Sequence, residues 1–161
     1  MTKVLFVCLG NICRSPAANG IFNALINKNH LSGSIACDSC GTGNWHIGCL
    51  PDKRMREAGA RHGYAFDHRA RQFDPENDFK DFDLILTMDN ENLRDVRALA
   101  GTAQDLAKIK LFTNFCNGDY ANTLIVEDPY FSEKPDAFDA VIAHVENGCE
   151  GLLKFLTEKQ A

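Results

Sequence analysis

Residues 3–16 of this chain, KVLFVCLGNICRSP, join an apolar run to a polar, glycine-containing turn and then to a Ser-Pro pair. The run from Lys3 to Cys8 is typical of a buried strand. Ser15-Pro16 favours the start of a helix, with the proline at the first helical position. The stretch therefore predicts a strand, a tight loop that begins at Cys8, and a helix that ends near Asn29-His30.

The rest of the chain continues this alternation of strands and helices. Further strands are expected at about residues 35–39, 83–88 and 109–112, and further helices at about residues 51–62, 89–100 and 135–158. Such alternation predicts an α/β fold with a parallel sheet, in which ligands bind beyond the carboxyl ends of the strands. The helix at residues 51–62 is expected to expose its basic side chains to solvent, namely Arg54, Arg56 and Arg61.

The composition excludes several classes of protein. A net charge of −5 argues against a global attraction to nucleic acid or to an anionic membrane. No apolar run reaches the length of a membrane span, and Val4–Leu9 is too short for a signal-peptide core. Seven cysteines at irregular spacing favour reduced thiols and a cytoplasmic protein. Cys37-x-x-Cys40 has no second pair at zinc-finger spacing, so no metal site is expected.

The loop after the first strand has the residue types that phosphoryl transfer needs. Backbone N–H groups at a helix N-terminus form an anion cradle, and Gly10 allows an unusual backbone angle there. Arg14 can grip two phosphate oxygens at once. Cys8 would lie at the bottom of the cradle as the nucleophile, where the same positive field favours a thiolate. The predicted phosphate-binding residues are Leu9, Gly10, Asn11, Ile12, Cys13, Arg14 and Ser15.

The leaving group of an aryl phosphate needs a proton donor, and a phosphocysteine then needs an activated water. One carboxyl group can serve both steps in turn. From the residues alone two aspartates compete for this role, Asp89 at a strand end and Asp128 in a loop beside Pro129. Either could instead be a helix cap or a turn residue, and Asp89 is interpreted as an N-cap.

Other side chains near the loop suggest a cleft and a redox partner. Trp45 and Tyr130 are loop aromatics that could form the walls of a pocket for a phenyl ring, with loop packing as the alternative. Ile12 would place an apolar side chain beside the same ring. Cys13 could trap an oxidised Cys8 as a disulfide, which protects it from irreversible oxidation, or could be a small buried apolar residue.

The stretch from Val7 to Pro16 resembles the signature loop of the low-molecular-weight protein tyrosine phosphatases. The likeness extends over nearly the whole chain, through Asp38-Ser39-x-Gly41-Thr42, His62-Gly63, His68-x-Ala70-Arg71-Gln72, Met88-Asp89, Asn92-Leu93-Arg94 and Asp128-Pro129-Tyr130. Two positions depart from the family pattern: Cys40 stands where alanine is common, and Phe131 stands where a second tyrosine is usual.

The resemblance implies a fold and a reaction. Residues 1–161 would form a single low-molecular-weight phosphotyrosine phosphatase domain, phosphatase type I-like, with a four-stranded parallel sheet in the order 2-1-3-4 and helices on both faces. The reaction would be hydrolysis of phosphotyrosine and of aryl phosphate monoesters through a phosphocysteine intermediate, without cofactor or metal ion. The implied partners are phosphotyrosine-containing proteins, including a tyrosine kinase or its substrates, with phosphate as the product. No nucleic acid or membrane partner is expected, and the assembly would be a monomer or a weak dimer.

The resemblance also assigns roles to individual residues. It makes Cys8 the nucleophile, Arg14 the phosphate clamp, and Asp128 the general acid and then the base. It implies that Trp45 and Tyr130 line the substrate cleft. A polar network that shapes the loop would consist of Asn11, Ser15, Ser39 and His68.

Three alternative functions fit parts of the pattern. Arsenate reductases of this fold need two further cysteines in a mobile segment, whereas residues 81–113 contain none. Phosphoarginine phosphatases on the same scaffold typically carry threonine where this chain has Ile12. A phosphoprotein-binding or redox-sensing module would need the cradle but no turnover, and the presence of both Arg14 and Asp128 argues against it.

Overall fold

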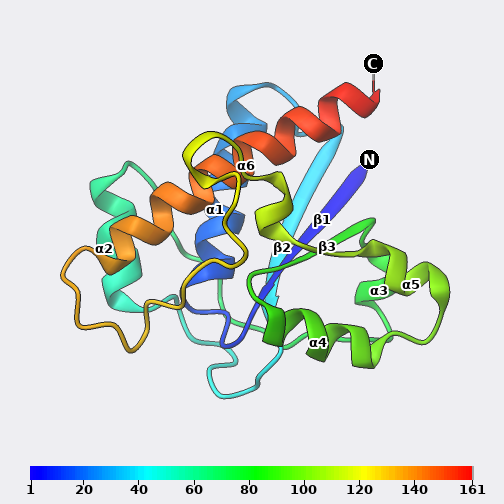
Figure 1. Cartoon of the computed structure of the whole chain (residues 1–161), viewed down its shortest axis with the longest axis horizontal. Helices are drawn as coiled ribbons and strands as arrows, with labels where there is room; N and C mark the ends of the chain where they lie inside the picture. Colours follow the sequence, from blue (N-terminus) through cyan, green and yellow to red (C-terminus); the bar gives the residue numbers. More distant parts are fainter. Residues whose placement is uncertain (161) are drawn as a thin grey trace.

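Four parallel strands form the central sheet of the structure, a computed structural model that describes residues 1–160 (Figure 1). The strands are β1 (Thr2–Cys8), β2 (Ile35–Gly41), β3 (Leu84–Thr87) and β4 (Ile109–Leu111). Their order is β2-β1-β3-β4, so the predicted order is confirmed. Val7 is opposite Cys40 of β2 and Thr87 of β3, which brings the carboxyl ends of these strands to one edge of the sheet.

Helices cover both faces of the sheet, as predicted. Val4 and Phe6 of β1 pack into one apolar core, and Leu5 and Val7 pack into another. β1 therefore buries both of its faces, which explains its continuous apolar run. The first core includes residues of α1 (Arg14–Lys28), α2 (Lys53–Arg61) and α6 (Ala137–Gln160), and the second includes residues of α3 (Asp78–Asp81) and α4 (Asn90–Leu99).

Several local details differ from the sequence prediction. Helix α1 begins at Arg14, so Pro16 occupies its third position and not its first. Proline is tolerated there because the first N–H groups of a helix have no intrahelical acceptor. The short elements that sequence periodicity missed are α3, α5 (Ala103–Lys108), η1 (Phe112–Phe115) and η2 (Gly118–Tyr120).

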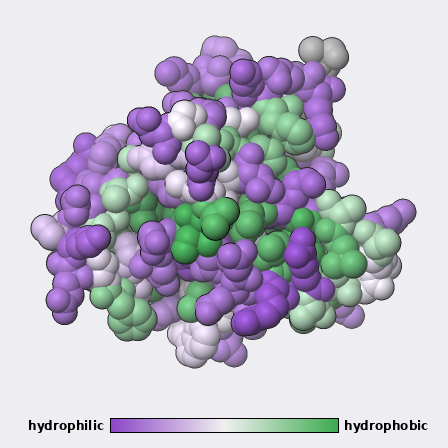
Figure 2. Space-filling model, in the orientation of Figure 1, coloured by the Kyte–Doolittle hydropathy of each residue, from purple (hydrophilic) through white to green (hydrophobic). Residues whose placement is uncertain are grey.

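The surface shown in Figure 2 is hydrophilic around its edge and carries a band of apolar side chains across its middle. Within the described part of the chain, every helix is too short or too polar to cross a lipid bilayer. The most exposed aromatic side chains are Trp45, at 68%, and Phe131, at 88%. Both come from loops at the carboxyl end of the sheet, where the candidate site lies.

Candidate active site

Asn11 fixes the backbone of the loop that joins β1 to α1. Its φ angle of 57° lies in the left-handed region, which asparagine tolerates better than most residues. The buried side-chain amide donates hydrogen bonds to Ser15 Oγ at 2.8 Å and to Ser39 Oγ at 3.0 Å. Its carbonyl oxygen accepts a hydrogen bond from the Arg71 backbone N–H at 3.0 Å. One side chain thus ties the loop to α1, to β2 and to the segment that follows α2.

The end of β2 packs closely against the backbone of the same loop. A β-carbon on Gly41 would lie 2.7 Å from the Leu9 carbonyl oxygen and 3.1 Å from the Asn11 nitrogen. The next two residues, Thr42 and Gly43, donate backbone hydrogen bonds to the carbonyls of Cys8 and Leu9, both at 2.9 Å. Only glycine allows this close approach of the two backbones.

Three of the four residues predicted to form the polar network are joined by direct hydrogen bonds. Asn11 bonds to both serines, and Ser15 Oγ lies 2.9 Å from Cys8 Sγ. His68 is linked to them through Asp38. Its Nδ1 lies 3.6 Å from an Asp38 carboxylate oxygen, and the same oxygen accepts a hydrogen bond from the Ser39 backbone N–H.

The guanidinium of Arg14 is held from one side. Its Nη1 donates hydrogen bonds to Asp89 Oδ2 at 2.7 Å and to the Val126 carbonyl at 3.0 Å. Within residues 1–160, Nε and Nη2 make no hydrogen bond, although Nη2 lies 3.6 Å from Asp128 Oδ2. Burial lowers the pKa of Arg14, but the nearby Cys8 sulfur and the hydrogen bond to Asp89 outweigh it and raise the pKa overall. Two adjacent donors of a permanently charged group therefore remain available to a phosphate.

Asp89 has two structural tasks. Its Oδ1 accepts a hydrogen bond from the Asn92 backbone N–H at 2.8 Å, which confirms that Asp89 caps α4. Its other oxygen accepts a hydrogen bond from Arg14, a contact that no sequence pattern indicates because it joins residues 75 positions apart. Since Asp89 does not line the cavity described next, it is poorly placed to protonate a leaving group.

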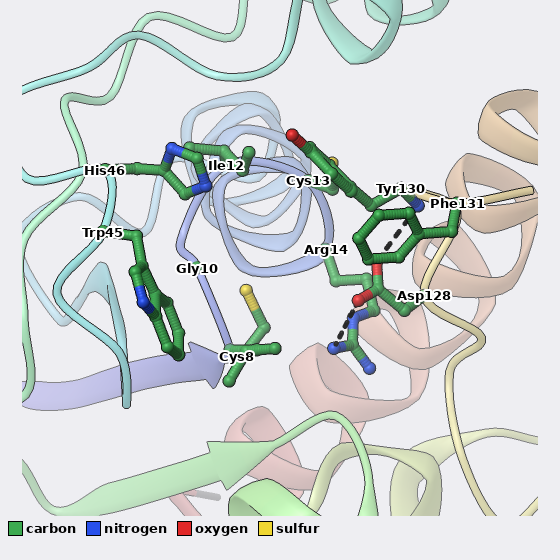
Figure 3. Close-up of a pocket in the computed structure, with 11 residues that line it drawn as sticks. Cys8, Gly10, Ile12, Cys13, Arg14, Trp45, His46, Asp128, Tyr130 and Phe131 are labelled. Carbon is green, nitrogen blue, oxygen red and sulfur yellow. Dashed lines mark hydrogen bonds and ion pairs between the residues drawn. The ribbon is translucent and has the colours of Figure 1, made fainter.

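A cavity of about 410 Å³ opens above the loop. Figure 3 shows the Cys8 sulfur pointing into it, between Trp45 and His46 on one side and Asp128 with Tyr130 on the other. The predicted wall residues, Ile12, Trp45 and Tyr130, all line this cavity, as do His46 and Phe131, which were not assigned a role. In the sequence, the one feature that could have indicated His46 and Phe131 is that each directly follows a predicted wall residue in a loop.

Asp128 lies at the side of the cavity, opposite Trp45 (Figure 3). Its side chain is 38% exposed, so it can exchange protons with solvent. One carboxylate oxygen accepts a hydrogen bond from the Tyr130 backbone N–H at 3.2 Å, and the other faces Arg14. The structure therefore brings Cys8, Arg14 and Asp128 together around one space.

The remaining thiols differ in their relation to the site. All seven cysteines are free, and Cys13 lines the cavity and occupies the N-cap position of α1 without a capping hydrogen bond from its side chain. Burial raises the pKa of Cys13 above its ordinary value. Cys37 and Cys40 pack into the two different cores, on opposite faces of β2, so they cannot hold one metal ion together. No group of three or more potential metal ligands occurs among the residues that the structure describes.

The chain is similar to known phosphatases over nearly its whole length. A family model described as "Low molecular weight phosphotyrosine protein phosphatase" matches residues 3–161. The low molecular weight protein-tyrosine-phosphatase YfkJ of Bacillus subtilis is 40% identical over 161 residues, which cover 99% of each chain. A crystal structure of a protein tyrosine phosphatase from Entamoeba histolytica has a TM-score of 0.92 and 39% identity, with both chains fully covered. A Drosophila arginine phosphatase structure has a TM-score of 0.86 and 34% identity, covering 96% of this chain and 98% of its own.

These similarities agree with the geometry of the site, in which Arg14 is held beside the loop that begins at Cys8. The chain belongs to the low molecular weight phosphotyrosine protein phosphatase family.

The close approach of Gly41 to the loop predicts the effect of adding one methyl group. Gly41→Ala should displace the loop backbone and weaken both inorganic phosphate binding and kcat/KM for an aryl phosphate by about 10- to 100-fold, because small misplacements of reacting groups are costly. Phosphate inhibition constants and steady-state kinetics measure this.

Gly33→Ala is the matched control, because a β-carbon there would meet nothing within 4 Å. It should leave both quantities unchanged. Wild-type phosphate affinity in Gly41→Ala would show that the loop does not depend on this contact.

Proposed function

We propose that this chain is a protein-tyrosine-phosphatase that hydrolyses phosphotyrosine and other aryl phosphate monoesters through a phosphocysteine on Cys8. The observation that carries the proposal is one cavity that joins a thiol, the open edge of a guanidinium and a carboxyl group. These belong to Cys8, Arg14 and Asp128. We also propose that residues 1–161 form one domain, which the match of the family model over residues 3–161 supports.

In the first step the phosphate enters the loop and meets the backbone N–H groups of residues 9–15. Arg14 binds two of its oxygens through Nε and Nη2. The Cys8 thiolate attacks phosphorus, so that the S–P bond forms as the bond from phosphorus to the aryl oxygen breaks. The protonated carboxyl of Asp128 gives its proton to that oxygen, and the phenol leaves neutral.

In the second step the carboxylate of Asp128 accepts a proton from water. The water oxygen attacks phosphorus, the S–P bond breaks, and inorganic phosphate and the Cys8 thiolate result. Ser15 Oγ lies 2.9 Å from Cys8 Sγ, so its hydroxyl can donate a hydrogen bond to the departing thiolate. The reaction as written needs no metal ion and no cofactor.

The walls of the cavity favour an aromatic substrate. Trp45 and Tyr130 stand on opposite sides of the space above Cys8, and Ile12 adds an apolar side chain (Figure 3). Such walls suit a flat phenyl ring. The proposed partners are phosphotyrosine-containing proteins, including a tyrosine kinase or its substrates. The free state of all seven cysteines supports a cytoplasmic location, and we propose a monomer or weak dimer without nucleic acid or membrane partners.

Phosphoarginine hydrolysis is the alternative that the same cradle could support. The similar Drosophila protein is described as an arginine phosphatase. This chain has Ile12 at the position where such enzymes typically have threonine, and its aromatic walls favour a phenyl ring over a guanidino group.

A panel of substrates tests the reaction. Phosphotyrosine should be cleaved in the presence of a chelator, with phosphoserine and phosphoarginine cleaved far more slowly, because the walls suit an aromatic ring. Cys8→Ser should abolish turnover while keeping phosphate binding. Arg14→Lys should lose on the order of 10²-fold or more in kcat, because lysine cannot make the paired contact. Substantial activity in Cys8→Ser would overturn the mechanism.

Leaving-group dependence tests the assignment of the acid. Asp128→Ala should slow phosphotyrosine cleavage by on the order of 10²–10⁴-fold, the usual contribution of acid–base catalysis. The loss in the first step should shrink for an aryl ester with a strongly acidic phenol, which leaves without protonation. Burst kinetics separate this step from dephosphorylation.

Asp89→Ala is the comparison variant. It should release Arg14 and weaken the cap of α4 by roughly 1 kcal/mol, so that activity falls equally for all leaving groups. A leaving-group dependence that follows Asp89 and not Asp128 would show that the acid is wrongly assigned.

The placement of Cys13 predicts a reversible response to oxidation. Peroxide should convert Cys8 to a sulfenic acid, and the Cys13 thiol should then attack that sulfur, release water and leave a Cys8–Cys13 disulfide. A thiol reductant should restore activity, and mass spectrometry of oxidised peptides identifies the bond. Oxidation of Cys8 to a sulfinic or sulfonic acid, with no Cys8–Cys13 bond, would contradict this role.

A further inference from the structure

Arg54 connects helix α2 to the loop that carries Asp128. Its Nη2 donates a hydrogen bond to the Tyr130 carbonyl at 3.1 Å. The guanidinium carbon also lies 5.4 Å from the centre of the Tyr130 ring and 4.7 Å from that of Phe138. These distances are those of cation–π contacts, so Arg54 holds both the backbone and the ring of a residue two positions after Asp128.

Asp52 orients the same guanidinium. Its two carboxylate oxygens accept hydrogen bonds from Arg54 Nε at 3.0 Å and from Nη2 at 2.9 Å, a bidentate pair. The side chain of Asp52 is only 12% exposed, and the hydrogen bonds from Arg54 lower the pKa of Asp52. The pair therefore stays ionised and fixed in direction, although Arg54 itself is half exposed.

The pair also reaches the phosphate loop. Asp52 caps α2, and its backbone N–H donates a hydrogen bond to the Ile12 carbonyl at 2.8 Å. A short path of contacts thus runs from Ile12 through Asp52 and Arg54 to Tyr130. It links the two loops that must act on one substrate, and Figure 1 shows α2 beside the segment that precedes α6.

The Tyr130 ring packs against the first apolar core and lies 6.3 Å from the His46 ring, but few hydrogen bonds and ion pairs reach the segment from residue 127 to residue 136 from outside. Within the described residues, those made by side chains are the Arg54 hydrogen bond to the Tyr130 carbonyl and the 3.6 Å ion pair of Arg14 with Asp128. The second involves Nη2 of Arg14, one of the two donors that a bound phosphate requires. Substrate binding therefore competes with the Arg14 contact but leaves the Arg54 contact in place, because Arg54 does not line the cavity.

We propose that Arg54 is a positioning residue, which holds the Asp128 loop so that the Asp128 carboxyl stays over the leaving group while Arg14 binds the phosphate. The inference rests on the proposed function, because it needs Asp128 as the acid. It changes the interpretation of Arg54 from a solvated helix residue to part of the catalytic support.

Leaving-group kinetics and a double-mutant cycle test this role. Arg54→Ala should lower kcat/KM for phosphotyrosine by about 10-fold or more, and by less for an aryl ester with an acidic phenol, because misplacing the acid matters only when protonation is needed. The inhibition constant of inorganic phosphate should stay near the wild-type value. In an Asp128→Ala background the same change should have no further effect on the first step.

Two further variants complete the test. Arg54→Lys keeps the charge but loses the bidentate pair with Asp52, so only partial activity should return. Arg61→Ala is the matched control, because Arg61 lies in the same helix, is 57% exposed, and pairs with Asp139 outside the acid loop. It should show no leaving-group dependence, and thermal unfolding of each variant reports its stability.

The outcomes separate this inference from the proposed function. An equal loss for all leaving groups in Arg54→Ala, or a full additional loss in the Asp128→Ala background, would refute the positioning role while Asp128 remained the acid. If Asp128→Ala itself shows no leaving-group dependence, the proposed mechanism fails first, and the role of Arg54 fails with it.

Discussion

The side-chain amide of Asn11 joins three segments at the carboxyl end of the sheet, and the geometry of the site depends on those hydrogen bonds. Its partners are Ser15 in α1, Ser39 in β2 and the Arg71 backbone. These hydrogen bonds stabilise the left-handed backbone conformation of Asn11, in a loop whose N–H groups must converge on one phosphate site. Without that convergence, Cys8 at the end of β1 would be a buried cysteine with no anion-binding site beside it.

Charge placement then gives the loop its chemistry. Asp89 and the Val126 carbonyl occupy one nitrogen of Arg14, which fixes the direction of the guanidinium and leaves its other edge open to the cavity. The same carboxylate caps α4, so the clamp is tied to the end of β3 through a helix start. The carboxyl of Asp128 lies on this open side, and in the proposed mechanism it exchanges a proton with the leaving group.

The sequence could predict the features that local pattern encodes. A strand buried on both faces has an uninterrupted apolar run in its sequence, so the sequence predicts β1 and the position of the loop after it. Helices of four to six residues, such as α3 and α5, are too short to show a period. Only the resemblance to the family indicates Asp128, because a loop aspartate has no distinguishing spacing in the sequence. The contacts of Arg14 with Asp89 and of Arg54 with Tyr130 join distant segments, so only the folded chain shows them.

The most direct test of the account is to find the phosphoryl group on the enzyme. Asp128→Ala, mixed with an aryl phosphate that has an acidic phenol and quenched in acid within the first turnover, should accumulate the intermediate because its hydrolysis lacks a base. Mass spectrometry of the digested protein should then locate one phosphoryl group on Cys8. Release of one equivalent of phenol with no phosphorylated peptide, or with the phosphoryl group on another residue, would contradict the account.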